Sequence, residues 1–166
     1  EEEIMFLFKN INYDENLVLD PLERAPFYIE GSYNDFKNYR NSQNTHFYAK
    51  KEFTKPEKDL IIFHGKLENQ NDFDREYSAI WSRKIKEYGI EPYDINRDKK
   101  MINGYSSFES IFEYENEGKI KKEYLLFFHN EEKYIVLSGI ATENLKKEIE
   151  DFKKFSNQIK FKNNNR

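Results

Sequence analysis

The stretch SFESIFEY, residues 107–114, decides the fold. Its large side chains Phe108, Phe112 and Tyr114 alternate with Glu109 and Glu113. Apolar and polar residues that alternate in this way are typical of a β-strand with one face in the core and the other in water. The pattern therefore predicts a strand that has both glutamates on its solvent side.

The flanking residues extend this strand into three consecutive antiparallel strands between Lys99 and Thr142. Polar segments at 115–119 and 129–133 are expected to form the two turns. Residues 120–128 carry large apolar side chains at consecutive positions, so both faces of that strand should be covered and it should lie centrally in the sheet. In the third strand, Gly139 predicts a bulge or a close contact.

Two helices are expected to flank this meander in the sequence. Apolar residues between positions 73 and 88 recur with helical spacing, and Gly89 stands where such a helix would end. Trp81 is expected to pin this helix to the sheet. After the meander, Thr142 is predicted to cap a second helix, whose apolar positions run from Leu145 to Ile159.

The N-terminal half predicts further strands. Short strands are expected at Ile4–Ile11 and Phe27–Tyr33, and a hairpin is expected from Thr45–Phe53 and Asp59–Leu67. The Asn-rich segment Asn34–Asn44 is expected to be a surface loop or an exposed helical turn. Together these elements predict a single α+β domain over residues 1–166, in which an antiparallel sheet of about six or seven strands is packed by two α-helices.

Composition limits the classes of function. The formal net charge is -4, so the chain as a whole does not attract phosphate backbones, and nucleic acid is not expected as a partner. The absence of cysteine excludes disulfides, thiolate chemistry and Cys-ligated zinc. The histidines, His46, His64 and His129, fall on separate candidate strands and turns, and no phosphate-loop, dinucleotide or hydrolase motif is found. We expect no metal, no cofactor and no catalytic residue.

Candidate partner-binding residues come from the types that proteins favour at interfaces. Aromatic and arginine side chains gather between positions 33 and 40. The alternative interpretation is that these rings fold back onto the core. Acidic residues on the solvent side of the strand at 107–114 would suit a basic partner. The candidates are Tyr33, Phe36, Tyr39, Arg40, Glu109 and Glu113.

Three short patterns connect the chain to a known family. The tripeptide at 102–104 follows the first helix, Tyr134 to Ala141 leads into the last helix, and Ile159 to Phe161 closes the domain. In this order, residues 60–162 resemble the PsbP superfamily, which includes DcrB-like bacterial lipoproteins. The resemblance implies an α/β/α sandwich that binds other proteins, and it carries no functional residue across. The family's usual aromatic-Pro-x-x-Trp turn is not visible, and the segment 34–44 also departs from the family.

The sequence thus predicts a non-enzymatic protein-binding domain of a bacterial cell-envelope protein. It would be either an accessory lipoprotein-type domain or an immunity protein that neutralises a toxin. The start at Glu1 fits a mature protein whose signal peptide has been removed, and also a chain trimmed for expression. A lipid anchor outside these residues would give peripheral membrane association, and a cytoplasmic location is the alternative. No apolar run approaches the roughly 20 residues of a transmembrane span.

Two other classes of function make distinct structural predictions. A small carboxylate-dependent hydrolase requires a deep pocket that holds two carboxyl groups in contrasting environments. A protein that binds lipid or another apolar ligand requires a dry cavity lined by phenylalanine side chains. A flat or gently concave surface favours protein binding instead.

Overall fold

The structure is a computed structural model that describes residues 21–31, 36–50, 59–68, 72–89 and 96–162. The expected strand Ile4–Ile11 and the candidate residue Tyr33 lie outside these ranges. The described residues form an α+β fold with a seven-stranded and a two-stranded sheet. In chain order, the elements are α2 (Pro21–Arg24), β1 (Phe27–Ile29), β2 (Phe36–Asn41), β3 (Thr45–Lys50), β4 (Asp59–Lys66), α3 (Asp72–Tyr88), β5 (Asn96–Ile102), β6 (Tyr105–Asn116), β7 (Lys119–His129), β8 (Lys133–Ala141), α4 (Leu145–Ser156) and β9 (Ile159–Phe161).

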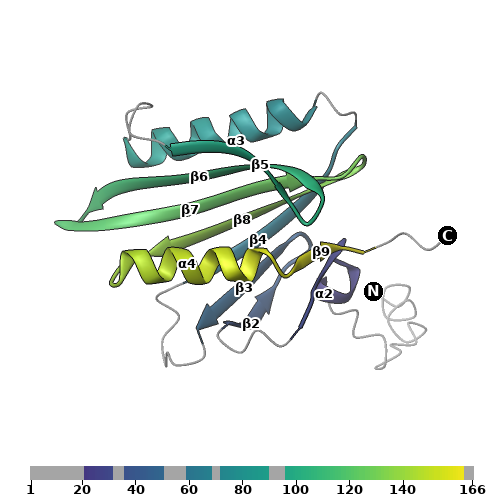
Figure 1. Cartoon of the computed structure of the whole chain (residues 1–166), viewed down its shortest axis with the longest axis horizontal. Coiled ribbons are helices and arrows are strands. Elements are labelled where there is room, and N and C mark those ends of the chain that lie inside the picture. Colours follow the sequence, from purple (N-terminus) through teal and green to yellow (C-terminus); the bar gives the residue numbers. More distant parts are fainter. Residues whose placement is uncertain (1–20, 32–35, 51–58, 69–71, 90–95, 163–166) are drawn as a thin grey trace, which may run out of the picture.

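The large sheet has the strand order β2-β3-β4-β8-β7-β6-β5, and every neighbouring pair is antiparallel (Figure 1). Strands β6, β7 and β8 are the predicted meander, with β7 between the other two. Strands β3 and β4 are the predicted hairpin, and β4 joins it to the meander by pairing with β8. The predicted sheet of about six or seven antiparallel strands is therefore confirmed.

Strand β7 is covered on both faces, as its sequence predicts. Tyr124, Leu126 and Phe128 lie in one core cluster together with residues of α4, whereas Leu125 and Phe127 lie in a second cluster together with residues of α3. All five side chains are at most 1% exposed. Because consecutive residues of a strand point to opposite faces, α3 and α4 cover opposite faces of the sheet. The small sheet of β1 and β9 adds to the α4 face.

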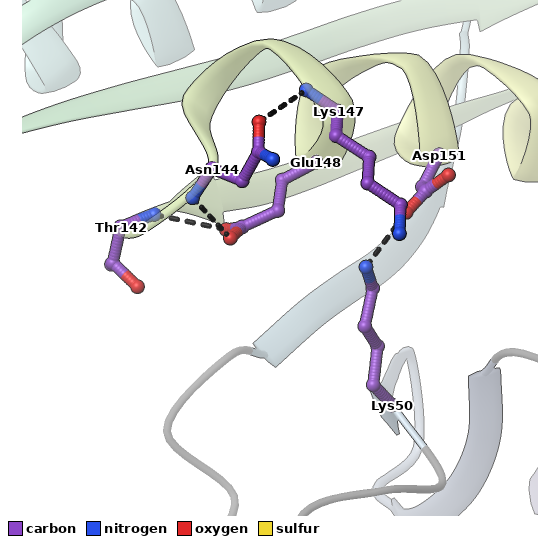
Figure 2. Close-up of polar contacts among 6 residues, drawn as sticks. All are labelled: Lys50, Thr142, Asn144, Lys147, Glu148 and Asp151. Atoms are coloured by element: carbon purple, nitrogen blue, oxygen red, sulfur yellow. Dashed lines mark hydrogen bonds and ion pairs between the residues drawn. The ribbon is translucent and has the colours of Figure 1, made fainter.

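The N-terminus of α4 is fixed by two side chains of its own segment (Figure 2). The Oδ1 atom of Asn144 accepts a hydrogen bond from the backbone N–H of Lys147 at 3.3 Å. The buried carboxylate of Glu148 accepts hydrogen bonds from the backbone N–H groups of Thr142 and Asn144, each at 3.0 Å. The prediction that Thr142 caps the helix was wrong, because Asn144 provides the capping oxygen and Thr142 contributes a backbone donor.

The seat of α4 on the sheet combines an ion pair and a close contact. Lys50 of β3 donates to Asp151 of α4 at 2.7 Å, and both side chains are largely buried (Figure 2). A Cβ atom at Gly139 of β8 would lie 2.8 Å from the ring of Phe152. The predicted close contact at Gly139 is thus confirmed, since the ring of Phe152 occupies the space of a side chain.

Two strands at the edges of the sheet were not predicted. The segment 34–44, expected to be a loop or helical turn, contains β2, and the charged segment Asn96–Ile102 forms β5. The pairing of β2 with β3 shifts in register between Asn38 and Arg40, so its side chains do not alternate regularly. Edge strands also tolerate charged and amide side chains, which removes the apolar pattern on which a strand prediction rests.

The ends of the two long helices differ in how well the sequence predicts them. Helix α3 ends at Tyr88, and Gly89 has the positive φ of +63° that suits its predicted place after the helix. Trp81 packs against the α3 core cluster, as predicted. Helix α4 ends at Ser156, and Ile159, which was predicted to continue it, lies in β9 and pairs with Ile29 of β1.

Replacing Gly139 by alanine is expected to destabilise the fold more than replacing Gly65. An added Cβ would meet Phe152 at 2.8 Å in one case and Tyr134 at 2.4 Å in the other. Phe152 is 1% exposed, and the added Cβ would lie closest to its Cδ2, Cε2 and Cγ atoms, so the ring has little room to move away. Tyr134 is half-buried, and the added Cβ would lie closest to the far end of its ring, at Cζ, Oη and Cε1. We expect Gly139→Ala to lower the free energy of unfolding by about 1–3 kcal/mol in urea titrations. A larger loss for Gly65→Ala would contradict the described seat of α4.

Replacing Glu148 by glutamine is expected to weaken the start of α4. The amide retains one acceptor oxygen but turns an NH₂ group toward one of the two backbone donors, so one buried N–H loses its partner. We expect a loss of about 1–3 kcal/mol in the free energy of unfolding. Glu150→Gln is the matched control, because Glu150 is exposed on the same helix. Equal melting temperatures for the two variants would show that Glu148 does not hold this end.

Candidate functional site

One part of the sheet face on the α3 side lies outside both core clusters. Phe47 of β3 and Ile61 of β4 are direct cross-strand partners, and neither belongs to a cluster. Their sequence neighbours Tyr48 and Leu60 are buried in the α4 cluster, so Phe47 and Ile61 point to the opposite face. Both are partly exposed. Phe63, also partly exposed, packs against the margin of the α3 cluster.

Strand β2 adds two side chains to this surface. The ring of Tyr39 lies with its centroid 6.2 Å from that of Phe47, and the guanidinium of Arg40 lies 5.4 Å from the centroid of the Phe47 ring. Tyr39 is 44% exposed. We call the surface formed by Tyr39, Arg40, Phe47, Ile61 and Phe63 the outer face. It brings together aromatic, aliphatic and arginine side chains, which are enriched in the cores of protein interfaces.

The predicted partner-binding residues of the segment 33–40 divide between two faces. Tyr39 and Arg40 lie on the outer face. Phe36 is buried on the other side of the sheet, where its ring lies 5.9 Å from that of Phe152 and 5.2 Å from that of Phe155. Phe36 therefore follows the alternative interpretation, in which the ring folds back onto the core.

The two predicted acidic candidates do not join this surface. Glu109, expected on the solvent side of its strand, is only 5% exposed, which corrects that prediction. Helix α4 covers it, and its carboxylate pairs with Lys153 of α4 at 3.5 Å and with Lys100 of β5. Glu113 is exposed and pairs with Lys122 at 3.0 Å, but it lies on the α4 side of the sheet. Neither glutamate shares a face with Tyr39.

The buried carboxylates of Glu109 and Glu123 do not meet in one pocket. Glu109 faces α4, whereas Glu123 of β7 faces α3, where it pairs with Lys84 at 3.1 Å and accepts a hydrogen bond from the Ser138 hydroxyl. Neither carboxylate lines the two cavities described below. The arrangement expected of a carboxylate-dependent hydrolase is therefore not supported by this pair.

Two cavities flank the segment of α2 and β1. The larger has a volume of about 800 Å³, and its lining includes the cationic side chains of Arg24, Lys66, Lys133 and Lys162. The smaller has a volume of about 360 Å³, and of its lining residues only Phe27 is a phenylalanine. In the part of the chain that the structure describes, neither cavity has the phenylalanine lining expected of a lipid-binding cup.

Two histidines meet beside the larger cavity, although the sequence did not indicate it. The rings of His46 and His64 are stacked, with centroids 5.4 Å apart, and the edge of Phe27 contacts both. Burial, His46 and Lys133, in that order, lower the pKa of His64 from 6.5 to about 4. His64 is therefore neutral at pH 7. Among the described residues, no group of three histidine, aspartate or glutamate side chains is placed to hold a metal ion.

The comparisons with known proteins identify related folds only. No family model and no curated protein matches the sequence. LpqN of Mycobacterium tuberculosis, which is involved in cell envelope biogenesis, has a similar structure, with a TM-score of 0.55, 11% identity, and coverage of 80% of this chain and 81% of its own. A protein of Bacteroides thetaiotaomicron VPI-5482 has a TM-score of 0.53 and 11% identity over 86% of this chain. This chain spans about half of that protein's length.

At 11% identity, the likeness to these two structures is a likeness of fold. The resemblance to the PsbP superfamily stays a prediction.

The helices of the described residues are too short or too polar to cross a membrane.

Acid is expected to destabilise the protein partly through His64. Between pH 6.5 and about pH 4 the unfolded chain protonates this side chain while the folded chain keeps it neutral, so stability falls as the pH falls through this window. His64→Gln should therefore flatten the decline of the melting temperature over this range, measured against the wild type. His129→Gln, at a histidine outside both cavities, is the control. An unchanged slope in His64→Gln would contradict the described burial of His64.

Proposed function

We propose that the chain is a non-enzymatic protein-binding domain that works at the bacterial cell envelope, and that its outer face contacts the partner. The observation that carries this proposal is the exposure of Tyr39, 44%, beside the partly exposed Phe47 and Ile61 on one sheet face. Clustered apolar side chains that remain in contact with water mark interaction surfaces.

The shape and composition of the outer face favour a protein over a small molecule. None of its five residues lines either of the two described cavities, and small ligands bind in concave sites that enclose most of their surface. Tyrosine and arginine are among the residue types that most often dominate binding energy in protein complexes. Tyr39 and Arg40 both come from β2, at the edge of the sheet.

The separation of Glu109 and Glu123 supports the non-enzymatic part of the proposal. Glu109 and Glu123 are each neutralised by lysine on opposite faces of the sheet, which is the arrangement of structural ion pairs. A pair of catalytic carboxyl groups would have to face one substrate from a shared pocket.

The envelope location draws on the similarity of fold to LpqN, a protein involved in cell envelope biogenesis. This support is an analogy between folds, because a fold does not determine function. Of the two forms predicted from the sequence, we propose the accessory lipoprotein-type domain. The immunity form expected acidic and aromatic residues on one exposed face, and the buried Glu109 and the distant Glu113 do not provide it.

A photo-crosslinking amino acid placed at position 39 of the full-length protein tests this function in the bacterium that makes it. We expect position 39 to crosslink to a specific envelope protein, and position 120 to give no such product. Ile120 is the matched control because it is a 55% exposed apolar residue at the start of β7, where it lies on the opposite face of the sheet from the outer face. With the identified partner, Tyr39→Ala should weaken binding at least tenfold, or about 1.4 kcal/mol, and Ile120→Ala should not.

Three outcomes would count against the proposal. Identical crosslinks at positions 39 and 120 would remove the outer face as the contact. A partner from the cytoplasm would contradict the envelope location while leaving protein binding intact. A turnover of the partner by the purified chain would contradict the non-enzymatic role.

A further inference from the structure

The larger cavity is built where five segments of the chain converge. Residues 23–26 of the α2–β1 segment form one wall, and residues 43–44 of the β2–β3 turn form another. The end of β4, residues 64–66, contributes the histidine and a lysine. Lys133 at the start of β8 and Lys162 just after β9 complete the lining. The cavity shares no residue with the outer face, so it is a separate site.

The charge of this cavity is opposite to that of the protein. Its lining contains four cationic side chains, those of Arg24, Lys66, Lys133 and Lys162, against one carboxylate, that of Glu23, in a chain with a net charge of -4. Among the described residues, Arg24 and Lys66 form no ion pair with a carboxylate. Like charges gathered around a cavity concentrate a positive potential in it, which raises the local concentration of anions.

Hydrogen bonds join the segments of the lining in two pairs. The Nζ atom of Lys162 donates to the carbonyl oxygen of Glu23 at 2.6 Å, and its backbone N–H donates to that of Pro26 at 2.8 Å. On the opposite side, the backbone N–H of His64 donates to the carbonyl oxygen of Asn44 at 3.0 Å. Lys162 is thus joined to the α2–β1 segment, and the end of β4 is joined to the β2–β3 turn, before any ligand enters. Such preorganisation lowers the cost of binding.

His64 is a partly buried residue of this lining. Its Nε2 atom is buried and has no hydrogen-bond partner among the described residues. Burial is the largest cause of the low pKa of His64, followed by His46 and then by the positive charge of Lys133. An anion bound in the cavity would offset that charge and favour the imidazolium, so the titration of His64 reports on occupancy.

We propose that this cationic cavity binds a small molecule through a phosphate group. A doubly charged oxyanion with several acceptor oxygens matches an arginine and three lysines better than a single carboxylate does. The volume of about 800 Å³ leaves room for an attached uncharged part, and it falls within the range of small-molecule sites. Gln43 and Asn44 supply amide groups, and Ala25 and Pro26 supply apolar contact, for that part.

The test is a titration of the full chain with inorganic pyrophosphate and with glucose 6-phosphate at constant ionic strength, followed by the NMR signals of the histidine rings. We expect saturable shifts of the His64 signals, a rise in the pKa of His64, and no saturable shift at His129. Lys66→Gln and Arg24→Gln should each weaken binding at least tenfold. Lys146→Gln, at an exposed lysine of α4, is the matched control and should bind as the wild type does.

A second arm identifies the carrier of the phosphate. Vesicles of phosphatidylcholine with and without phosphatidic acid are compared for binding in a flotation assay. Saturable binding of pyrophosphate or glucose 6-phosphate supports the proposal, whether or not the protein also binds vesicles that contain phosphatidic acid. Binding to phosphatidic acid alone, lost in Lys66→Gln, also supports it and assigns the phosphate to a lipid headgroup.

Shifts that rise linearly with concentration, or that are as large with sodium chloride, would overturn the proposal. So would binding that survives in the double variant Arg24→Gln, Lys66→Gln. Tyr39→Ala should leave phosphate binding unchanged, so this result and that for the outer face are independent.

Discussion

The burial of β7 on both faces is the constraint on which the rest of the structure depends. Leu125 and Phe127 require a covering layer on one side, and Tyr124, Leu126 and Phe128 require one on the other. Helices α3 and α4 provide these layers.

A helix is about 10 Å wide with its side chains, whereas a sheet of seven strands is about 30 Å wide. One helix per face therefore cannot cover the whole sheet. On the α4 side, α2 and the β1–β9 pair extend the cover. On the α3 side, the α3 cluster reaches β4 at Phe63, and neither core cluster covers β2 and β3 on this face among the described residues.

The same constraint relates the two candidate sites to each other. The outer half of the sheet is held to α4 by the pair of Lys50 and Asp151 and by the contact of Phe36 with Phe152. The face that the described residues leave uncovered is therefore backed by a packed layer, as the proposed docking surface requires. The cationic cavity forms where α2 and the end of β9 meet the end of β4, so it depends on the cover of the α4 side. One sheet thus presents a partly exposed, largely apolar surface on one face and a cationic cavity beside the end of β4.

The sequence predicts those elements whose apolar pattern is set by the core. Strand β7, its neighbours β6 and β8, and helix α3 follow from spacing alone, because each packs against a layer that requires large apolar side chains at fixed intervals. Strand β2 does not, since a bulge at Asn38 to Arg40 interrupts its alternation. The exposure of Glu109 was predicted wrongly for a different reason. Alternation shows that the two faces of a strand differ, but it does not show that a lysine of α4 will cover the polar face.

Tyr39 and Arg40 could be proposed from residue type, whereas Phe36, in the same segment, turns inward. The cationic cavity could not be found, because its five segments are distant in the sequence and carry no shared motif.

The most direct test of the central claim measures whether the outer face is open in solution. A soluble gadolinium chelate enhances the relaxation of methyl protons that it can approach, and Ile61, Val136 and Leu125 place methyl groups on the same side of the sheet. Ile61 belongs to the outer face, whereas Val136 and Leu125 are at most 1% exposed beneath α3. The account predicts a relaxation enhancement at Ile61 several times larger than at the other two. If Ile61 is protected as well as Val136, another part of the protein covers this surface, and the account of an open docking face is wrong.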